Sequence, residues 1–294
     1  MAISDYVHQE TTVAPPADPS AAGHREYDVE ESFDRIVDQG RARTRRPWAD
    51  LLATGAVGGI EVGFGILALL SVEMMTGSKL LGGLAFSIGF IALLLGHSEL
   101  FTEGFLVPVT VVVAGEARLR DLLRFWVGTL LGNLAGGLLL AYLVDKAFPD
   151  LQAVANSTAA SYINAGLSLR TFCLAVLAGG AITLLTRMHN GTDEMLPKMV
   201  ASIAIAFLLA GVHLFHSVLD SLLAFTALCT GHAPFGWLDW MAWFVWAVAG
   251  NLVGGLVLTT VLRLVRSRRR LGDYREANDR PTTALVGRPR RPEG

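Results

Sequence analysis

Long apolar segments alternate with short polar connections along the central part of the chain, residues 48–266. Six segments approach or exceed the roughly 20 residues with which an α-helix crosses a bilayer, and they lie at about 51–72, 80–113, 122–144, 171–188, 198–228 and 239–265. The second and fifth are too long for one straight helix, and polar residues interrupt both. Irregular backbone inside a membrane is tolerated only where it is buried in protein or lines a water-filled cavity. The pattern therefore predicts an all-α membrane protein with six transmembrane helices, of which the second and fifth are broken.

The two ends of the chain are polar. Residues 1–47 form an N-terminal tail in which Phe33, Ile36 and Val37 recur at helical spacing. This spacing leaves two interpretations open, a short amphipathic surface helix and a partly ordered tail. Residues 267–294 form a basic tail that we expect to be disordered.

The composition also favours a membrane protein. Hydrophobic residues make up 52% of the chain and charged residues 17%, whereas about a quarter of the residues in soluble domains are charged. The mean hydropathy is +0.46. The net charge of −2 says little about partners, because the charges gather at the tails. Cys173 and Cys229 have apolar neighbours, so we expect buried thiols and neither a disulfide nor a metal site.

Basic residues predict the orientation. If the chain crosses six times, the main groups of lysine and arginine all fall on one side, which predicts that both termini are cytoplasmic. These residues are Arg41, Arg43, Arg45, Arg46, Arg118, Arg120, Arg187, Lys198, Arg263, Arg266, Arg268, Arg269 and Arg270. The opposite connections carry few positive charges, chiefly Lys79 and Lys146.

The chain contains an internal repeat. GNLAGG at Gly132 recurs as GNLVGG 118 residues later, at Gly250, and HSELFT at His97 recurs loosely as HSVLDS 119 residues later, at His216. Because each half has an odd number of spans, the second half must enter the membrane from the opposite side. The repeat predicts an inverted, aquaporin-like arrangement in which the paired broken helices place a binding or permeation site near the membrane centre.

Ionisable residues gather at the two predicted breaks. They are His97, Glu99, Glu103, His213, His216 and Asp220. An ionisable group near the bilayer centre costs a few kcal/mol or more, so these residues indicate a protein interior or an aqueous pathway. We expect a pathway in which the imidazole of His216 passes or lends a proton, while a hydrogen-bonded structural histidine stays open.

Structural roles are equally open for several of these groups. His97 either belongs to the pathway or fixes the broken backbone. Glu99 and Glu103 are expected to cap the following half-helix or to bind loop amides, and we expect the same of Asp220. Glu61, inside the first span, is expected to pair with a neighbouring helix.

The repeated motif itself predicts close helix packing. Small residues four positions apart lie on one helix face and let backbones approach, and here they are Gly132, Gly136, Gly250 and Gly254. Asn133 and Asn251 are then expected to hydrogen-bond the carbonyl groups that the broken spans leave free.

The sequence does not predict an enzyme. It has no phosphate-binding or dinucleotide-binding glycine pattern and no metalloprotease motif. We expect no cofactor, no metal and no nucleic-acid partner. A metal site built from His213, His216 and Asp220 is the less favoured alternative.

Taken together, these features resemble the formate/nitrite transporter family of pentameric channels. The resemblance rests on the six spans, KLLGGLAFSIGF leading into ELFTEGF, the histidine of the fifth span and the duplicated GNL-GG motif, over about residues 48–266. The segment EESFDRIVDQGRARTRRPW looks like the YfdC-like branch. The resemblance implies a homopentamer in the lipid of a bacterial inner membrane, with one pore per protomer for a small monovalent anion or its conjugate weak acid.

The resemblance also implies roles for single residues. Thr102 would face a central histidine that matches His216. His213 remains a second candidate, because the glycine-to-histidine spacing is three in the family and five from Gly211 to His216 here. The apolar constrictions would come from Leu100, Phe101, Phe86, Phe90 and Phe207.

Two departures from the family pattern bear on the permeant. Where the formate channels carry a lysine before the fourth span, this chain has Leu167 or Ser168, with only Arg170 nearby. Glu103 and Asp220 would repel an anion if ionised. Our main hypothesis is a proton-assisted pore for weak acids. A pore for neutral small solutes and a non-conducting membrane scaffold or sensor acting through its tails are the alternatives.

Overall fold

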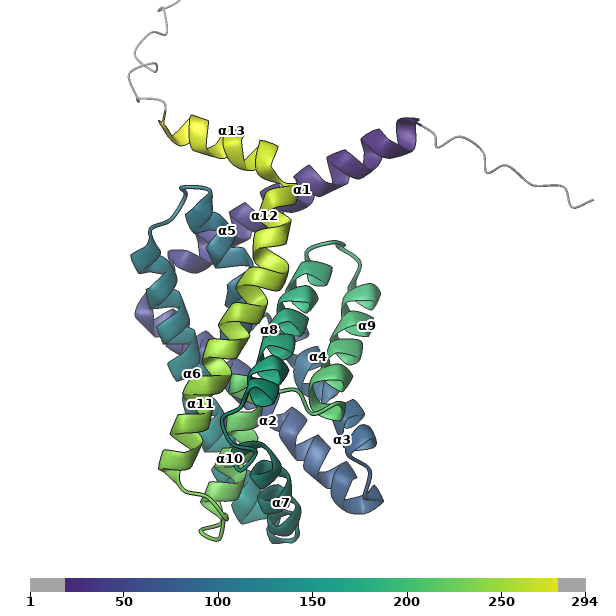
Figure 1. Cartoon of the computed structure of the whole chain (residues 1–294), viewed down its shortest axis with the longest axis vertical. Helices are drawn as coiled ribbons and strands as arrows, with labels where there is room; N and C mark the ends of the chain where they lie inside the picture. The colour runs from purple at the N-terminus through teal and green to yellow at the C-terminus, as the bar shows by residue number, and fades with distance from the viewer. Residues whose placement is uncertain (1–18, 280–294) are drawn as a thin grey trace, which may run out of the picture.

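The computed structural model describes residues 19–279, and every regular element in this range is helical (Figure 1). The elements are α1 (Pro19–Thr44), α2 (Trp48–Thr76), α3 (Lys79–Ala85), α4 (Ser87–Gly96), η1 (Phe101–Phe105), α5 (Val107–Val113), α6 (Leu119–Ala147), η2 (Pro149–Leu151), α7 (Gln152–Ile163), α8 (Leu169–His189), α9 (Met195–Ala206), η3 (Phe207–Gly211), α10 (Ser217–Cys229), α11 (Trp237–Val253), η4 (Gly254–Val261), α12 (Leu262–Arg266) and α13 (Arg268–Asp279). η1 and η2 are 3₁₀ turns, whereas η3 and η4 have π-helical geometry.

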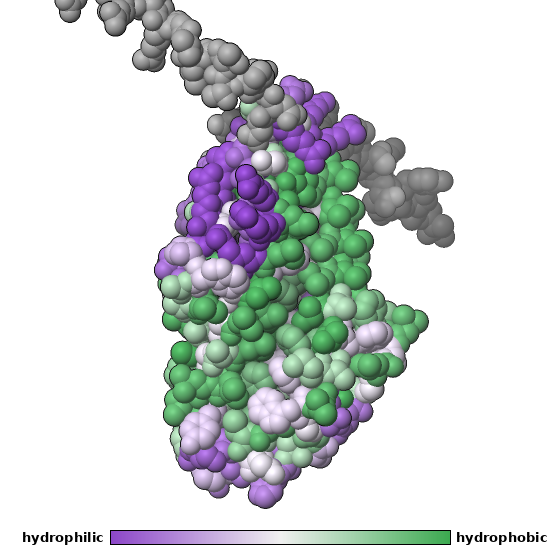
Figure 2. Space-filling view, turned by 90° about the vertical axis from the view of Figure 1, so that its left-hand side faces the viewer, coloured by the Kyte–Doolittle hydropathy of each residue, from purple (hydrophilic) through white to green (hydrophobic). Residues whose placement is uncertain are grey.

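Five helical stretches in the described part of the chain are long and apolar enough to cross a membrane. They are Trp48–Thr76, Lys79–Gly96, Leu119–Ala147, Leu169–His189 and Trp237–Arg266. Three shorter apolar stretches, Phe101–Val113, Met195–Gly211 and Ser217–Cys229, complete the predicted second and fifth spans. Both broken helices are therefore present. On the face that Figure 2 shows, hydrophobic residues cover most of the middle and hydrophilic residues gather towards the two ends.

The N-terminal and C-terminal helices lie at the same end of the molecule, as an even number of crossings requires (Figure 1). We call this the α1 end. Phe33, Ile36 and Val37 of α1 are fully buried, and α1 packs along α5, where a Cβ on Gly40 would lie 2.1 Å from a methyl group of Val111. Of the two interpretations left open by the sequence, the structure has the helix, and its apolar residues pack on protein.

The expectation that residues 267–294 are disordered is wrong for the part that the structure describes, because residues 268–279 form α13. Asp34 of α1 accepts two hydrogen bonds from the Arg270 guanidinium, at 2.9 and 2.5 Å, and one from the Tyr274 hydroxyl at 3.0 Å. The rings of Phe33 and Tyr274 lie 6.0 Å apart. This polar contact holds α13 against α1. Residues 1–18 and 280–294 of the two tails lie outside the described residues.

Replacing Asp34 by asparagine is expected to loosen α13 from α1. The Arg270 guanidinium holds the pKa of Asp34 below the ordinary carboxyl value of 3.8. A lowered folded pKa means that the contact stabilises docking at neutral pH and loses this contribution as the pH falls below 3.8. For a partly exposed pair the contribution is about 0.5–1 kcal/mol.

Amide hydrogen exchange of α13 at pH 7 measures this effect. We expect faster exchange in Asp34→Asn and no change in Glu276→Gln, a variant of an exposed carboxylate on α13. Equal protection of α13 in Asp34→Asn and the wild type would show that the ion pair does not hold the helix.

The first broken helix is tied to its neighbours by one asparagine. The Asn133 side-chain amide donates to the carbonyl groups of Gly55 and Glu99, at 2.8 Å each. Its carbonyl oxygen accepts from the Phe101 backbone N–H at 2.9 Å. The carbonyl contact expected for Asn133 is therefore present, on the non-helical segment between α4 and η1.

The second broken helix repeats this arrangement. Asn251 donates to the carbonyl groups of Ala175 and Phe215, at 2.8 Å each, and accepts from the Ser217 backbone N–H at 2.9 Å. The two asparagines, 118 residues apart, thus hold equivalent chain breaks in the two halves. This is the inverted repeat that the duplicated motif predicts.

The structure corrects the register of the repeat at the breaks. His97 and His213, which lie 116 residues apart, both have a left-handed backbone with φ of 52° and 65°. Within residues 19–279 they are the only non-glycine residues with positive φ. Since Phe101 and Ser217 share this 116-residue offset, His97 corresponds to His213, and its alignment with His216 was wrong.

The glycines of the repeated motif sit at direct backbone contacts. A Cβ on Gly136 would lie 2.0 Å from the Ala56 carbonyl oxygen in α2, and one on Gly254 would lie 1.8 Å from the Val176 carbonyl oxygen in α8. Gly132 and Gly250 are equally confined, with the nearest atoms 2.7 and 2.4 Å from the added Cβ. The predicted close packing is present in both halves.

The expected burial of the two cysteines is wrong for Cys173, which is exposed on α8, and Cys229 is only partly buried. Their apolar neighbours include residues on the hydrophobic outer surface, and an apolar sequence alone does not distinguish a protein core from a lipid-facing surface.

Candidate functional site

The two chain breaks meet at one hydrogen bond. Thr102 Oγ1, in η1, lies 2.9 Å from His216 Nε2, and neither residue is exposed to solvent. His216 also begins α10, because its Nδ1 accepts the Leu219 backbone N–H at 3.1 Å. A neutral imidazole has one donor and one acceptor nitrogen, so this cap places the proton on Nε2. Nε2–H then donates to Thr102, whose hydroxyl hydrogen is left for another acceptor.

Asp220 holds the backbone around this histidine. Its carboxylate accepts the His216 backbone N–H at 2.8 Å, and it is 1% exposed. Asp220 therefore binds a loop amide, which is the structural contact expected of it. The carboxylate is directed at the main chain of the break.

Four apolar side chains that are expected to form constrictions belong to one buried core cluster. Leu100 and Phe86 are fully buried, and Phe101 and Phe90 are 3% and 2% exposed. The rings of Phe86 and Phe90 pack edge to face with centroids 5.2 Å apart. Four of the five side chains expected to form constrictions therefore lie inside the protein.

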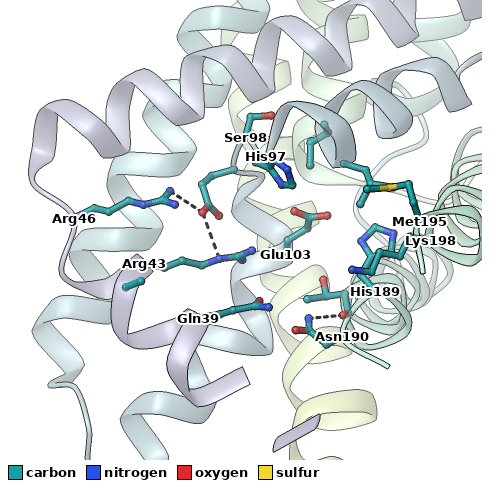
Figure 3. A pocket seen from close by; sticks show the side chains of 15 residues that line it. Gln39, Arg43, Arg46, His97, Ser98, Glu103, His189, Asn190, Met195 and Lys198 are labelled. Carbon is teal, nitrogen blue, oxygen red and sulfur yellow. Dashed lines mark hydrogen bonds and ion pairs between the residues drawn. The ribbon is translucent and has the colours of Figure 1, made fainter. Parts of the chain in front are cut away.

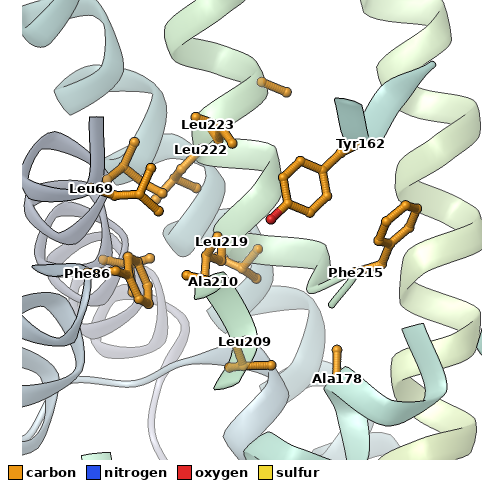
Figure 4. Packing of buried hydrophobic residues seen from close by; sticks show 14 of the residues in the cluster. Leu69, Phe86, Tyr162, Ala178, Leu209, Ala210, Phe215, Leu219, Leu222 and Leu223 are labelled. Atoms are coloured by element: carbon orange, nitrogen blue, oxygen red, sulfur yellow. The ribbon is translucent and has the colours of Figure 1, made fainter. Parts of the chain in front are cut away.

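Phe207 differs from these four in its exposure, and its role in a constriction stays a prediction. It is 36% exposed and lies next to Gly211. The π-helical turn η3 changes which residues face inward, so Leu209 is the buried residue, at 1% exposure. Figure 4 shows Leu209 in the same apolar cluster as Phe86 and Leu219.

His213 occupies a separate place towards the opposite end. Its ring stacks on Tyr162 with centroids 3.7 Å apart, and its Nε2 lies 3.3 Å from Ser161 Oγ. Thr102 contacts His216 and not His213. His213 lies three residues before His216 and has the left-handed backbone conformation that favours glycine. In the family, a glycine precedes the central histidine by three residues. His213, and not Gly211, therefore occupies the position of that glycine.

A cavity of about 370 Å³ opens at the α1 end. Its polar lining includes Gln39, Arg43, Arg46, His97, Ser98, Glu99, Glu103, His189, Asn190 and Lys198 (Figure 3). His97 follows the last residue of α4, so its left-handed backbone ends that helix while its side chain lines the cavity. Both expectations for His97 are compatible with this position.

The two glutamates of the first break differ from expectation. Glu99 pairs with Arg46 at 2.8 Å and Arg43 at 3.4 Å, both from α1 or the turn that follows it. Glu103 is 8% exposed and lines the cavity. Neither side chain caps a helix. The carboxylate of Glu99 instead forms ion pairs with the two arginines, and Glu103 lines the cavity. Glu61 accepts a hydrogen bond from Ser98, so it pairs with the break after α4.

Sequence reasoning missed the role of α1 in this cavity. Arg43 and Arg46 were read only as signs of orientation, and His189 and Lys198 were not expected near Glu103. No local pattern gives the path by which α1 folds back against α5. Among residues 19–279 no group of three or more metal-ligating side chains is placed to hold a metal ion.

Comparisons with known proteins agree with this fold. A family model described as formate/nitrite transporter matches residues 30–265. The inner membrane protein YfdC of Escherichia coli (strain K12) is 25% identical, over 84% of this chain and 81% of its own length. The formate channel BtFdhC of Bacillus thuringiensis is 24% identical, over 77% and 90%.

Solved structures share the architecture. An FNT family ion channel matches with a TM-score of 0.71 at 20% identity, over 80% of this chain and 98% of its own. A pentameric formate channel with formate bound matches with a TM-score of 0.62 at 21% identity, over 75% and 98%. The chain therefore shares its all-helical fold with both structures.

Proposed function

Because the chain belongs to the formate/nitrite transporter family, we propose that it forms a homopentameric channel in a bacterial inner membrane that carries a small monovalent anion or its conjugate weak acid. Membership makes the chain a membrane channel or transporter and not an enzyme. The relatives named formate channels and the inner membrane protein YfdC support the permeant class and the location. The basic residues support a cytoplasmic α1 end.

The contact between Thr102 and His216 carries this proposal. It joins the two broken helices through a 2.9 Å contact between two residues that are fully buried. The Thr102 hydroxyl hydrogen is the donor available to a passing anion, and the His216 N–H polarises it. The Thr102–His216 pair therefore offers hydrogen bonds to a permeant within an apolar part of the path.

The apolar surroundings favour the protonated weak acid. A bare anion loses its hydration between Leu100, Phe86 and Leu209 and recovers little of that free energy from one hydroxyl. Proton gain removes most of the cost. We therefore assign passage of the apolar segment to the neutral acid and a hydrogen-bonding role to Thr102 and His216.

The lysine that the formate channels carry before the fourth span is absent here, and this absence bears on which permeant the pore favours. Leu167 is 59% exposed, and Ser168 caps α8 by accepting the Thr171 backbone N–H. Neither supplies a positive charge at the opposite end. The positive charges near His213 at that end are Arg170 and Lys79. The absence of a lysine at the position of Leu167 or Ser168 favours a pore that depends on proton gain more than on anion capture.

Stopped-flow measurements on proteoliposomes test the proposal. Formate, nitrite, acetate, hydrosulfide and glycerol are compared at two pH values, with protein-free vesicles as the control. Weak-acid flux that rises at the lower pH without a matching electrical current is the expected result. A large anion current contradicts proton assistance, glycerol flux alone indicates a pore for neutral solutes, and no flux directs attention to a scaffold acting through the tails.

A further inference from the structure

We propose that the cavity at the α1 end is a dissociation site, in which Glu103 takes the proton of the permeating acid while Lys198 and Arg43 hold the anion that remains. This inference rests on the proposed function and adds a place where the proton and the anion separate. The cavity of about 370 Å³ has room for water and a small anion together.

Glu103 carries the first part of the argument. Only 8% of the residue is exposed, and within residues 19–279 its carboxylate forms no hydrogen bond and no ion pair. Its neighbour in sequence, Thr102, contacts the central histidine. Figure 3 shows Glu103 between Arg43 on one side and His189 and Lys198 on the other.

Glu99, in the same loop, is a carboxylate with a structural role and serves as a comparison for Glu103. It is paired with two arginines and is 1% exposed. A buried carboxylate without such partners costs free energy, which a purely structural role does not repay. The free carboxylate of Glu103 next to the permeation path therefore points to proton exchange.

The cavity also offers places for an anion. Arg43 Nη1 is buried without a hydrogen-bond partner in the described residues, although Arg43 Nε lies 3.4 Å from Glu99. Lys198 lines the cavity and, within residues 19–279, forms no ion pair. The ionisable groups that face or act on Glu103 are Arg43, Arg46, Glu61, His97, Glu99, His189 and Lys198. This mixture supplies positive charge for the anion next to a base for the proton.

The central histidine is poorly placed for the same task. Its Nδ1 is occupied by the Leu219 N–H, and taking a second proton would break that cap. Asp220 is bound to a backbone amide. In the part of the chain that the structure describes, Glu99 and Asp220 each have one oxygen without a hydrogen-bond partner, but Glu99 is paired with arginines and Asp220 with a backbone amide. Glu103 lines the cavity with a carboxylate that has neither kind of partner among the described residues.

The step balances in both directions. The O–H bond of the acid breaks, a new O–H bond forms on a Glu103 carboxylate oxygen, and the electron pair stays on the permeant as its negative charge. The proton then leaves Glu103 for cavity water. Export runs through the same steps in reverse, and no oxidant or reductant is needed.

Glu103→Gln tests the site, because it keeps the side-chain size and removes the base. We expect weak-acid flux to fall by at least about tenfold, a modest loss for removal of a proton acceptor, and its pH dependence to flatten. Glu103→Asp is expected to retain most of the pH dependence. Glu276→Gln, an exposed carboxylate on α13, serves as the control for general charge effects.

Flux in Glu103→Gln that equals or exceeds the wild type overturns the proposal, since it makes the carboxylate a bystander or an electrostatic barrier to anions. Infrared difference spectra between two pH values add a readout that needs no transport. A carboxyl band that titrates in the wild type and disappears in Glu103→Gln supports proton exchange at Glu103, and its absence contradicts it. Wild-type protein that carries no weak acid would instead refute the proposed function, whatever the spectra show.

Discussion

Replacement of His216 by alanine is expected to lower weak-acid flux by about 100-fold, the lower end of the range for loss of a preorganised hydrogen-bond donor. The imidazole donates to Thr102 at 2.9 Å and caps α10 at the same time. Alanine removes both contacts. Flux in proteoliposomes, corrected for the amount of folded protein, measures the effect.

His216→Asn separates the two roles of the histidine. Asparagine is a good N-cap residue, so this variant keeps an acceptor for the Leu219 N–H and avoids the loss of about 1 kcal/mol expected for alanine. Its side chain is too short to reproduce the contact from Nε2 to Thr102. We expect His216→Asn to fold like the wild type and to lack flux. Wild-type flux in this variant would mean that the histidine acts only as a cap.

Replacement of Asn133 by leucine is expected to prevent stable folding. The side chain makes three hydrogen bonds to backbone groups of α2 and the first break, and each buried group left unpaired costs about 1–3 kcal/mol. The total approaches the 5–15 kcal/mol of net stability typical of folded proteins. Asn251→Leu removes the equivalent three bonds in the second half and is expected to behave alike.

Size-exclusion chromatography and thermal unfolding in detergent measure this loss. Asn164→Leu is the matched control, because Asn164 is exposed at the end of α7. We expect the control to unfold close to the wild type, while both motif variants aggregate or unfold at much lower temperature. An Asn133→Leu protein as stable as the control would show that water replaces the lost contacts at the break.

The spans and their breaks could be predicted because the membrane restricts the chain so strongly. An apolar run of fixed length has few alternatives, and the polar residues at His97 and His216 were sufficient to locate the interruptions. The role of Asn133 followed from the same reasoning, since free carbonyl groups in a membrane need a donor. The repeated motif then indicated Asn251 as its counterpart.

Contacts between distant, partly polar surfaces could not be predicted in this way. Nothing near Asp34 in sequence indicates that Arg270 and Tyr274 will meet it, and the tail containing them resembles any other basic segment. The π-helical turn that exposes Phe207 and buries Leu209 leaves no signature in the hydropathy. The alignment of the two breaks could not be predicted from the sequence either. The similar residues that follow His97 and His216 suggested that these two histidines are equivalent, whereas the backbone geometry relates His97 to His213.

The corrected repeat register also bears on direction. At the 116-residue offset that relates the two breaks, Glu103 corresponds to Leu219, so the first break carries a carboxylate where the second carries an aliphatic side chain. A passive pore must conduct equally both ways when the permeant is dilute, since detailed balance allows nothing else. Detailed balance does not require the permeant to saturate the pore at the same concentration from both sides. The concentration that half-fills the pore will therefore differ between the two sides of the membrane, and a protein built from two similar halves has kinetic polarity without an energy source.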